Sequence, residues 1–229
     1  MHSDPEHDGA AVEGVRRVLD RLLADGTARS RLDSTSHELF PVAMGAEEGE
    51  ALASWVRREA AGHTVEIGLG YGLASLFVCL GLLEVGDPTM RHVVLDPNQA
   101  SRFSDLGRQH LGEAGLDQLV EFHARASQFA LPAFLEAGRR FDLAVVDGNH
   151  RFDGVFVDLC YLGQLLGPGR VVFLDDYQLP GVARATAFFV SNLGWTIEQV
   201  STSDADHHFA VLRTSTTPDE RDFRHFVDF

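Results

Sequence analysis

The sequence has 229 residues, of which 45% are hydrophobic and 23% charged, so it predicts one globular domain with a sizeable core. The formal net charge of −15 disfavours a nucleic-acid partner, because neutralising phosphates requires clustered lysine and arginine. No apolar run reaches membrane-spanning length and the N-terminus is acidic rather than a signal peptide, so we expect a cytoplasmic protein without membrane contact.

The beginning of the chain is predicted to be a helical cap. Its first ten residues are polar and are expected to be disordered. Apolar residues then recur at helical spacing from Val15 to Leu23, and Gly26 is a typical C-terminal stop. The expected domains are therefore 1–45, a helix and cap segment, and 46–229, the main domain. The N-terminal helices are candidates for pairing between two copies in a homodimer.

Short apolar runs alternate with helical segments through the rest of the chain. The predicted strands are Thr64–Ile67, His92–Leu95, Leu119–His123, Leu143–Val146, Val171–Leu174, Thr196–Val200 and His208–Leu212. Helices are predicted over or near 46–61, 73–83, 98–111, 129–137, 153–166 and 182–193. Such alternation predicts an α/β fold, a doubly wound, mostly parallel, seven-stranded Rossmann-like sheet. No long helix separates the last two strands, so we expect an antiparallel hairpin at the sheet edge.

Three glycines at alternate positions follow the first of these strands. Gly68, Gly70 and Gly72 lead from it into an apolar helix that starts at Leu73. Glycine suits this turn because a side chain would restrict the backbone angles and keep a ligand away from the backbone. A strand, a tight turn and a helix open a nucleotide-binding α/β domain. A dinucleotide fingerprint requires glycine where Leu73 stands, which argues against a nicotinamide cofactor.

Acidic residues occur at the carboxyl ends of the predicted strands, where such sheets place functional groups. Asp147, Asp175 and Asp176 follow the fourth and fifth strands, which we expect to be neighbours. Three carboxylates at one edge repel unless a cation or protons neutralise them, and hard oxygen ligands suit Mg²⁺ or a similar divalent ion. The alternative is structural: Asp147 caps a turn with Gly148, and Asp175-Asp176 caps the next helix.

The spacing Glu66-x-Gly68-x-Gly70-x-Gly72 resembles the first motif of the class I S-adenosylmethionine-dependent methyltransferases. The resemblance extends over residues 40 to about 212, because further segments follow the family pattern in order. These segments are Asp96 after the second strand, Ala126-Ser127-Gln128 after the third, the D-G-x-H-x-Y-like run Asp147-Gly148-Asn149-His150-x-Phe152, and Gly167-Pro168-Gly169. Phe152 departs from the pattern, which usually has Tyr there, and this puts a hydroxyl role at that position in doubt.

The resemblance implies S-adenosyl-L-methionine as cofactor. The residues that it assigns to cofactor binding are Met44, Glu66, Gly68, Gly70, Tyr71, Gly72, Asp96, Pro97, Ala126, Ser127, Gln128 and Asp147. In this family the acid at Asp96 bonds both ribose hydroxyls. Tyr71 lies between the second and third glycines, where its ring is expected to pack on the methionine part of the cofactor. In the branch that resembles catechol O-methyltransferase, the acids matching Asp147, Asp175 and Asp176 hold a divalent ion, Mg²⁺ or similar.

His150, three residues after Asp147, is a candidate base that accepts a proton from a substrate hydroxyl, a further metal ligand, or a loop histidine bonded to the backbone. The leading interpretation is methyl transfer to an oxygen of a small-molecule acceptor, such as a natural-product intermediate, with Asp147 and His150 as catalytic residues and a divalent metal. The alternatives are a metal-independent N- or O-methyltransferase that uses His150, a nicotinamide-dependent oxidoreductase, and a non-enzymatic binding module.

Overall fold

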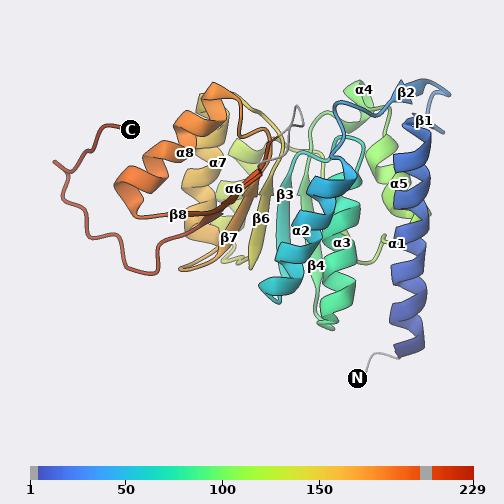
Figure 1. Ribbon diagram of the computed structural model, residues 1–229, viewed down its shortest axis with the longest axis horizontal. Coiled ribbons are helices and arrows are strands. Elements are labelled where there is room, and N and C mark those ends of the chain that lie inside the picture. Colours follow the sequence, from blue (N-terminus) through green and yellow to red (C-terminus); the bar gives the residue numbers. More distant parts are fainter. Residues whose placement is uncertain (1–4, 202–207) are drawn as a thin grey trace. The chain divides into compact units, whose positions relative to one another are not determined.

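The computed structural model describes residues 5–201 and 208–229, and the chain divides into two compact units, 1–125 and 126–229 (Figure 1). The boundary predicted at residue 45 differs from this division and stays a prediction. Within the described part of the chain, we find no helix with the length and apolarity needed to cross a membrane.

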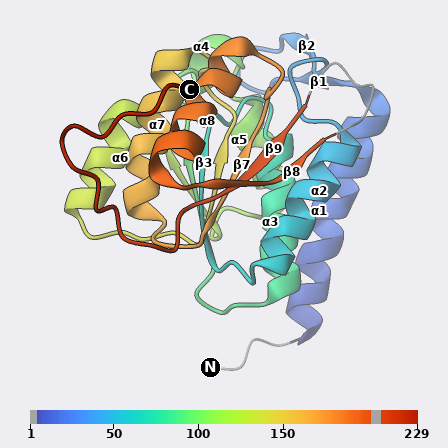
Figure 2. The same ribbon diagram turned by 60° about the vertical axis from the view of Figure 1, so that its left-hand side comes forward.

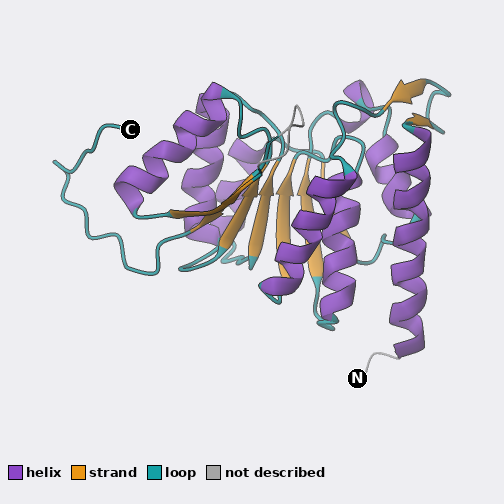
Figure 3. Cartoon of the chain, viewed as in Figure 1, coloured by secondary structure: helices purple, strands orange, loops and turns teal. Residues whose placement is uncertain are grey.

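The first unit contains a short hairpin and three strands of the main sheet, with helices between them. Its elements are α1 (Pro5–Asp25), β1 (Thr27–Arg29), β2 (Ser36–Glu38), α2 (Ala46–Arg58), β3 (His63–Ile67), α3 (Leu73–Val85), β4 (Arg91–Leu95), α4 (Gln99–Arg102), α5 (Leu106–Glu113) and β5 (Val120–His123). Strand β3 pairs in parallel with β4, and β4 with β5. The carboxyl ends of these strands therefore lie at one edge of the unit, as the arrows in Figure 3 show.

Helix α3 is the centre of the first unit. Every residue from Leu73 to Leu82 is buried, and the helix contacts α1, α2 and α5 (Figures 1 and 2). Two glycines let α2 and α3 approach closely: a Cβ on Gly49 would lie 2.0 Å from the Phe77 ring, and one on Gly81 would lie 2.8 Å from Val56. A helix that is apolar on all sides needs such covering by other helices.

The N-terminal region differs from its prediction in two ways. Helix α1 already begins at Pro5, so the part of the predicted disordered stretch from residue 5 onward is helical; residues 1–4 lie outside the described residues. The connection expected to lack regular structure contains the antiparallel pair β1–β2, in which Ala28 is opposite His37. Strands of three residues are too short to show an alternating pattern, so this hairpin has no recognisable sequence signal.

The second unit contains the remaining strands of the sheet. Its elements are α6 (Ser127–Glu136), β6 (Leu143–Val146), α7 (Phe152–Leu165), β7 (Val171–Leu174), α8 (Pro180–Leu193), β8 (Thr196–Val200) and β9 (Ala210–Arg213). Strand β6 pairs in parallel with β7, and helix α7 packs on α6 and α8. Strand β9 is antiparallel to both β7 and β8 and lies between them.

The strand order of the seven-stranded sheet is β5-β4-β3-β6-β7-β9-β8. This order confirms the predicted Rossmann-like, mostly parallel α/β fold with its antiparallel strands at one edge. The last strand begins at Ala210, two residues later than its predicted start at His208.

Candidate functional site

The glycines of the turn between β3 and α3 have the backbone angles that were predicted for them from the sequence. Gly68, Gly70 and Gly72 have φ angles of 98°, 51° and 87°, in the left-handed region that favours glycine. Gly72 is the N-cap of α3, and its N–H donates to the carbonyl of Leu69 at 2.7 Å. The first N–H groups of a helix have no partner within the helix, so the turn offers hydrogen-bond donors to a polar ligand.

Asp96 joins the end of β4 to this turn. Its Oδ2 accepts hydrogen bonds from the backbone N–H groups of Leu69 (3.2 Å) and Gly70 (3.1 Å), and its Oδ1 accepts one from Asn98 (2.7 Å). The Asp96 side chain is buried, and Gln99 Nε2 donates to Oδ2 at 2.8 Å. A carboxylate has about four acceptor positions, so a ribose hydroxyl would replace or share one of these donors.

Two residues that sequence reasoning missed support the turn from the side of α4 and α5. Gln99 Nε2 also donates to the carbonyl of Gly70 at 2.8 Å. Gly107 packs directly on the turn, because a Cβ there would lie 2.7 Å from the Gly70 carbonyl oxygen. Neither residue is part of a recognisable motif: Gly107 stands in a polar helix, and only the fold brings that helix against the turn.

Glu66, predicted to bind cofactor, lies fully buried within the first unit. Its Oε1 accepts a hydrogen bond from Ser75 Oγ at 2.8 Å, and its Oε2 lies 3.0 Å from Nε2 of His92. Nδ1 of His92 is 2.9 Å from Oγ1 of Thr64. The first residue of the glycine motif thus ties β3 to β4 and α3, and its role toward a cofactor stays a prediction.

Three further predicted cofactor residues lie in different settings of the first unit. Met44 is buried just before α2, and Pro97 is exposed after Asp96. Tyr71 is buried in the turn itself, and its hydroxyl lies 3.3 Å from Nδ1 of His37 on β2. Of the three, Tyr71 is therefore the one with a defined polar contact.

The predicted adenine-binding segment forms the start of α6 in the second unit. Ala126 is the N-cap, Ser127 opens the helix and Gln128 is exposed. The Ser127 hydroxyl donates to Asp158, a buried residue of α7 that sequence reasoning also missed. Burial raises the pKa of Asp158 to about 6, and the hydrogen bond from Ser127 opposes this rise.

His150 lies between two of the predicted acids of the second unit. Nδ1 of His150 is 2.7 Å from Oδ2 of Asp176, and Nε2 is 3.6 Å from Oδ1 of Asp147. Burial lowers the pKa of His150, but the hydrogen bond and charge of Asp176, with the charge of Asp175, outweigh burial and raise the pKa above its usual value. We name Asp147, His150, Asp175 and Asp176 the acid–histidine cluster.

The backbone around His150 is fixed by close packing on α8. A Cβ on Gly181 would lie 2.9 Å from the backbone nitrogen of Phe152 and 3.1 Å from the carbonyl oxygen of His150. Phe152, where the family pattern has Tyr, stacks on Phe156 with ring centroids 5.6 Å apart. The aromatic ring at this position thus serves packing, without need of a hydroxyl.

Two of the three acids predicted to hold magnesium pair with His150. Asp147 and Asp176 both face the imidazole of His150, and Asp176 adopts a left-handed φ of 54°. Asp175 is buried, and its Oδ1 has no hydrogen-bond partner among the described residues. Across residues 5–201 and 208–229, no three His, Cys, Asp or Glu side chains are gathered so as to hold a metal ion.

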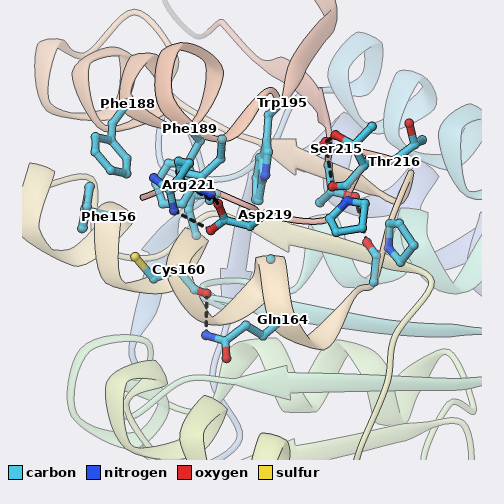
Figure 4. A pocket seen from close by; sticks show the side chains of 18 residues that line it. Phe156, Cys160, Gln164, Phe188, Phe189, Trp195, Ser215, Thr216, Asp219 and Arg221 are labelled. Carbon is cyan, nitrogen blue, oxygen red and sulfur yellow. Dashed lines mark hydrogen bonds and ion pairs between the residues drawn. The ribbon is translucent and has the colours of Figure 1, made fainter. Parts of the chain in front are cut away.

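A cavity of about 620 Å³ lies elsewhere in the second unit, between α7, α8 and the segment after β9 (Figure 4). Its wall contains the rings of Phe156, Phe188, Phe189 and Trp195, and the thiol of Cys160. None of the residues predicted for the functional site lines it. The cavity is therefore a separate feature from the acid–histidine cluster.

Comparisons with known proteins agree with the fold and the glycine turn. Residues 65–177 match the family model described as a methyltransferase domain. No curated protein sequence matches the chain.

Three solved structures illustrate the structural similarity. The O-methyltransferase TomG of Streptomyces achromogenes, solved with S-adenosylmethionine, is 20% identical with a TM-score of 0.67, and the match covers 93% of this chain and 91% of TomG. An O-methyltransferase of Bacillus cereus, solved with S-adenosylhomocysteine, is 16% identical with a TM-score of 0.68 and coverages of 89% and 90%. A putative O-methyltransferase of Klebsiella pneumoniae is 18% identical with a TM-score of 0.63 and coverages of 94% and 92%.

These matches and the glycine turn agree on both the fold and the type of enzyme. The chain carries a methyltransferase domain over residues 65–177 and is a methyltransferase with the fold of the class I S-adenosylmethionine-dependent enzymes.

Proposed function

We propose that this enzyme transfers a methyl group from S-adenosylmethionine to an oxygen atom of a small molecule, with His150 as the base. The observation that carries the proposal is the asymmetric environment of His150. Asp176 contacts Nδ1 at 2.7 Å, whereas Asp147 stands 3.6 Å from Nε2, beyond hydrogen-bond length. The charge of Asp176 therefore acts at Nδ1, and Nε2 is left to accept a proton.

The cofactor supplies an electrophilic methyl group when it is bound. The glycine turn and Asp96 of the first unit are the proposed cofactor holders, with Tyr71 at the turn and Ser127 at the start of α6. Nε2 of His150 would accept the proton of the acceptor hydroxyl, which makes that oxygen the nucleophile for the methyl group that the cofactor would supply. Asp176 holds the imidazole in position and stabilises the imidazolium that forms.

The oxygen acceptor and its small size are supported by the relatives. TomG, an O-methyltransferase, takes part in tomaymycin synthesis, and the Bacillus cereus protein is also an O-methyltransferase. Metal assistance by Asp147, Asp175 and Asp176 stays a prediction. The unpartnered oxygen of Asp175 is the one feature that favours it, and the pairing of Asp147 and Asp176 with His150 weighs against it.

The test has a binding arm and a turnover arm. Calorimetry with S-adenosylhomocysteine and with NAD⁺ measures which of the two compounds binds, and we expect S-adenosylhomocysteine alone to bind. Turnover is then screened with hydroxylated aromatic and polyketide-type acceptors after dialysis against EDTA. We expect His150→Ala to keep its affinity for S-adenosylhomocysteine while kcat falls by roughly 10²- to 10⁴-fold. Asp153→Asn, an exposed change on α7, is the matched control.

Each alternative has its own outcome. Binding of NAD⁺ in place of S-adenosylhomocysteine would identify an oxidoreductase. Activity that is lost in EDTA and restored by Mg²⁺ would replace the His150 mechanism with the metal-assisted one. Affinity for S-adenosylhomocysteine without turnover of any acceptor would favour a binding module, and unchanged turnover of His150→Ala would remove His150 as the base.

A further inference from the structure

The hydroxyl of Tyr71 is the end of a hydrogen-bonded chain that begins in the N-terminal hairpin. Nδ1 of His37 lies 3.3 Å from the Tyr71 hydroxyl, and Nε2 lies 3.1 Å from Oγ of Ser104. Ser104 Oγ in turn donates to Oδ2 of Asp33 at 2.8 Å. Four side chains from the hairpin, the 103–105 loop and the glycine turn are thus connected in sequence.

The carboxylate of Asp33 fixes the direction of each hydrogen bond in this chain. A backbone N–H bond from Thr35, together with the Ser104 hydroxyl bond, lowers the pKa of Asp33 to about 2, so its carboxylate only accepts near neutral pH. Ser104 uses its one proton for Asp33, and therefore accepts from Nε2–H of His37. A neutral imidazole with a proton on Nε2 has an acceptor at Nδ1, so the Tyr71 hydroxyl donates to His37.

Further contacts determine the position of Tyr71 as well. The Tyr71 ring meets His37 and Phe103 edge-on, with centroids 5.8 and 5.2 Å away. Ser104 and Asp105 have φ angles of 48° and 59°, a sharp local turn that places Ser104 beside the hairpin. Nδ1 of the buried His110 lies 2.8 Å from the Tyr71 carbonyl oxygen. Burial lowers the pKa of His110, which favours the neutral ring with Nδ1–H as donor.

The phenol also stays protonated in this environment. Burial raises the pKa of Tyr71, and the charge of Arg102 only partly opposes this. Since its single proton is used for His37, the lone pairs of the Tyr71 oxygen remain to accept from a ligand. The complementary group on the proposed cofactor is the ammonium of its amino-acid part, a charged donor.

We propose that His37 is a positioning residue that holds the Tyr71 hydroxyl as a hydrogen-bond acceptor for the amino-acid end of the cofactor. The hairpin β1–β2 then sets cofactor affinity through this contact, although it contributes no residue to the glycine motif. This proposal rests on the proposed function, because it takes S-adenosylmethionine as the ligand of the turn.

The test compares two ligands that differ in the amino-acid end. S-adenosylhomocysteine carries the ammonium, and 5′-methylthioadenosine lacks the amino-acid part. We expect His37→Ala to weaken S-adenosylhomocysteine binding by about two- to tenfold, the value of one net hydrogen bond. Binding of 5′-methylthioadenosine is expected to be unchanged. Ser36→Ala, an exposed change on the same strand, is the control and leaves both affinities unchanged.

Two further variants separate positioning from a general structural effect. His37→Asn keeps an acceptor near the place of Nδ1 and should restore most of the lost affinity. In the Tyr71→Phe background, His37→Ala should cause no further loss, because both changes remove the same contact.

The outcomes distinguish this proposal from the proposed function. If the wild type binds neither ligand, the cofactor assignment fails. If the wild type binds S-adenosylhomocysteine but His37→Ala weakens both ligands equally, or if its effect multiplies with that of Tyr71→Phe, the positioning role of His37 is overturned. Thermal unfolding of each variant verifies that the fold is intact.

Discussion

Oδ2 of Asp176 lies 2.7 Å from Nδ1 of His150, close enough for its charge to raise the pKa of the imidazole. The other acid, Asp147, is 3.6 Å from Nε2 of the same ring, so its interaction with the imidazole is weaker. The two carboxylates therefore have different effects on one ring, and exchanging each for an amide tests them separately.

Asp176→Asn is expected to move the acidic limb of the pH–rate profile to lower pH. A base must be neutral to accept a proton, so activity falls as the pH drops below the pKa of His150. Asp176 is a main cause of the raised pKa, and its removal lowers that pKa. The profile of kcat/KM between pH 5 and 9 measures the shift, with Asp153→Asn as control. An unmoved limb would contradict the role of Asp176.

The same pair makes stability depend on pH. The pKa of His150 is higher in the folded than in the unfolded chain, so the folded state binds a proton more tightly. This contribution is fully present below the unfolded pKa and is lost as the pH rises through the folded pKa. Asp176→Asn should thus destabilise most at acidic pH and least at alkaline pH. Urea unfolding at several pH values measures the difference, and a pH-independent loss would contradict it.

Asp158→Asn is expected to stabilise the protein above pH 6. The pKa of Asp158 is about 6 in the folded chain against 3.8 for an ordinary aspartate, so the folded state holds an extra proton between these values. Stability therefore decreases as the pH rises through this range, by up to about 3 kcal/mol. Asparagine carries no charge and still accepts from Ser127. The slope of unfolding free energy between pH 4 and 6 should flatten in the variant, and an unchanged slope would contradict the assignment.

Gly107→Ala is expected to abolish or strongly weaken cofactor binding. The added methyl group would lie 2.7 Å from the Gly70 carbonyl oxygen and would displace the glycine turn. Gly112→Ala is a matched control on the same helix, since its methyl group would meet only Asp117 at an ordinary 3.6 Å. Calorimetry with S-adenosylhomocysteine measures both variants. Equal affinities would show that the turn does not depend on Gly107.

Cys160 is expected to react with N-ethylmaleimide in the native protein, whereas Cys79 reacts only on unfolding. Cys160 is half-buried and faces the cavity of the second unit, but Cys79 is fully buried in α3. Burial raises the pKa of both thiols, that of Cys79 well above its usual value, so the reaction of Cys160 should accelerate at alkaline pH. Mass spectrometry should show one adduct, and none in Cys160→Ser.

The parts of the site that can be predicted from sequence are those with local patterns. Three glycines at alternate positions follow from the backbone angles of one turn, and Asp96 follows from its place at the end of a strand. The strands β3, β4, β6 and β7 were predicted because buried parallel strands are continuous apolar runs.

The parts that could not be predicted depend on partners distant in the chain. Gly107 is important only because α5 packs on the glycine turn. His37 and Tyr71 are in contact although they are 34 positions apart. The magnesium site also depends on side-chain orientation, and it stays a prediction. Three acids after adjacent strands have the same sequence pattern whether they converge on a cation or face a histidine, and side-chain orientation decides between the two arrangements.

Helix α1 has a consequence for the order in which the protein is made. Its buried residues Val15, Val18, Leu19 and Leu22 face the first unit, and Arg16 reaches Glu84 of α3 at 2.6 Å. Synthesis produces α1 before α3, and α3 is complete 60 residues after α1, because α1 ends at Asp25 and α3 at Val85. Until α3 is made, the apolar stripe of α1 therefore has no cover from this helix on the nascent chain.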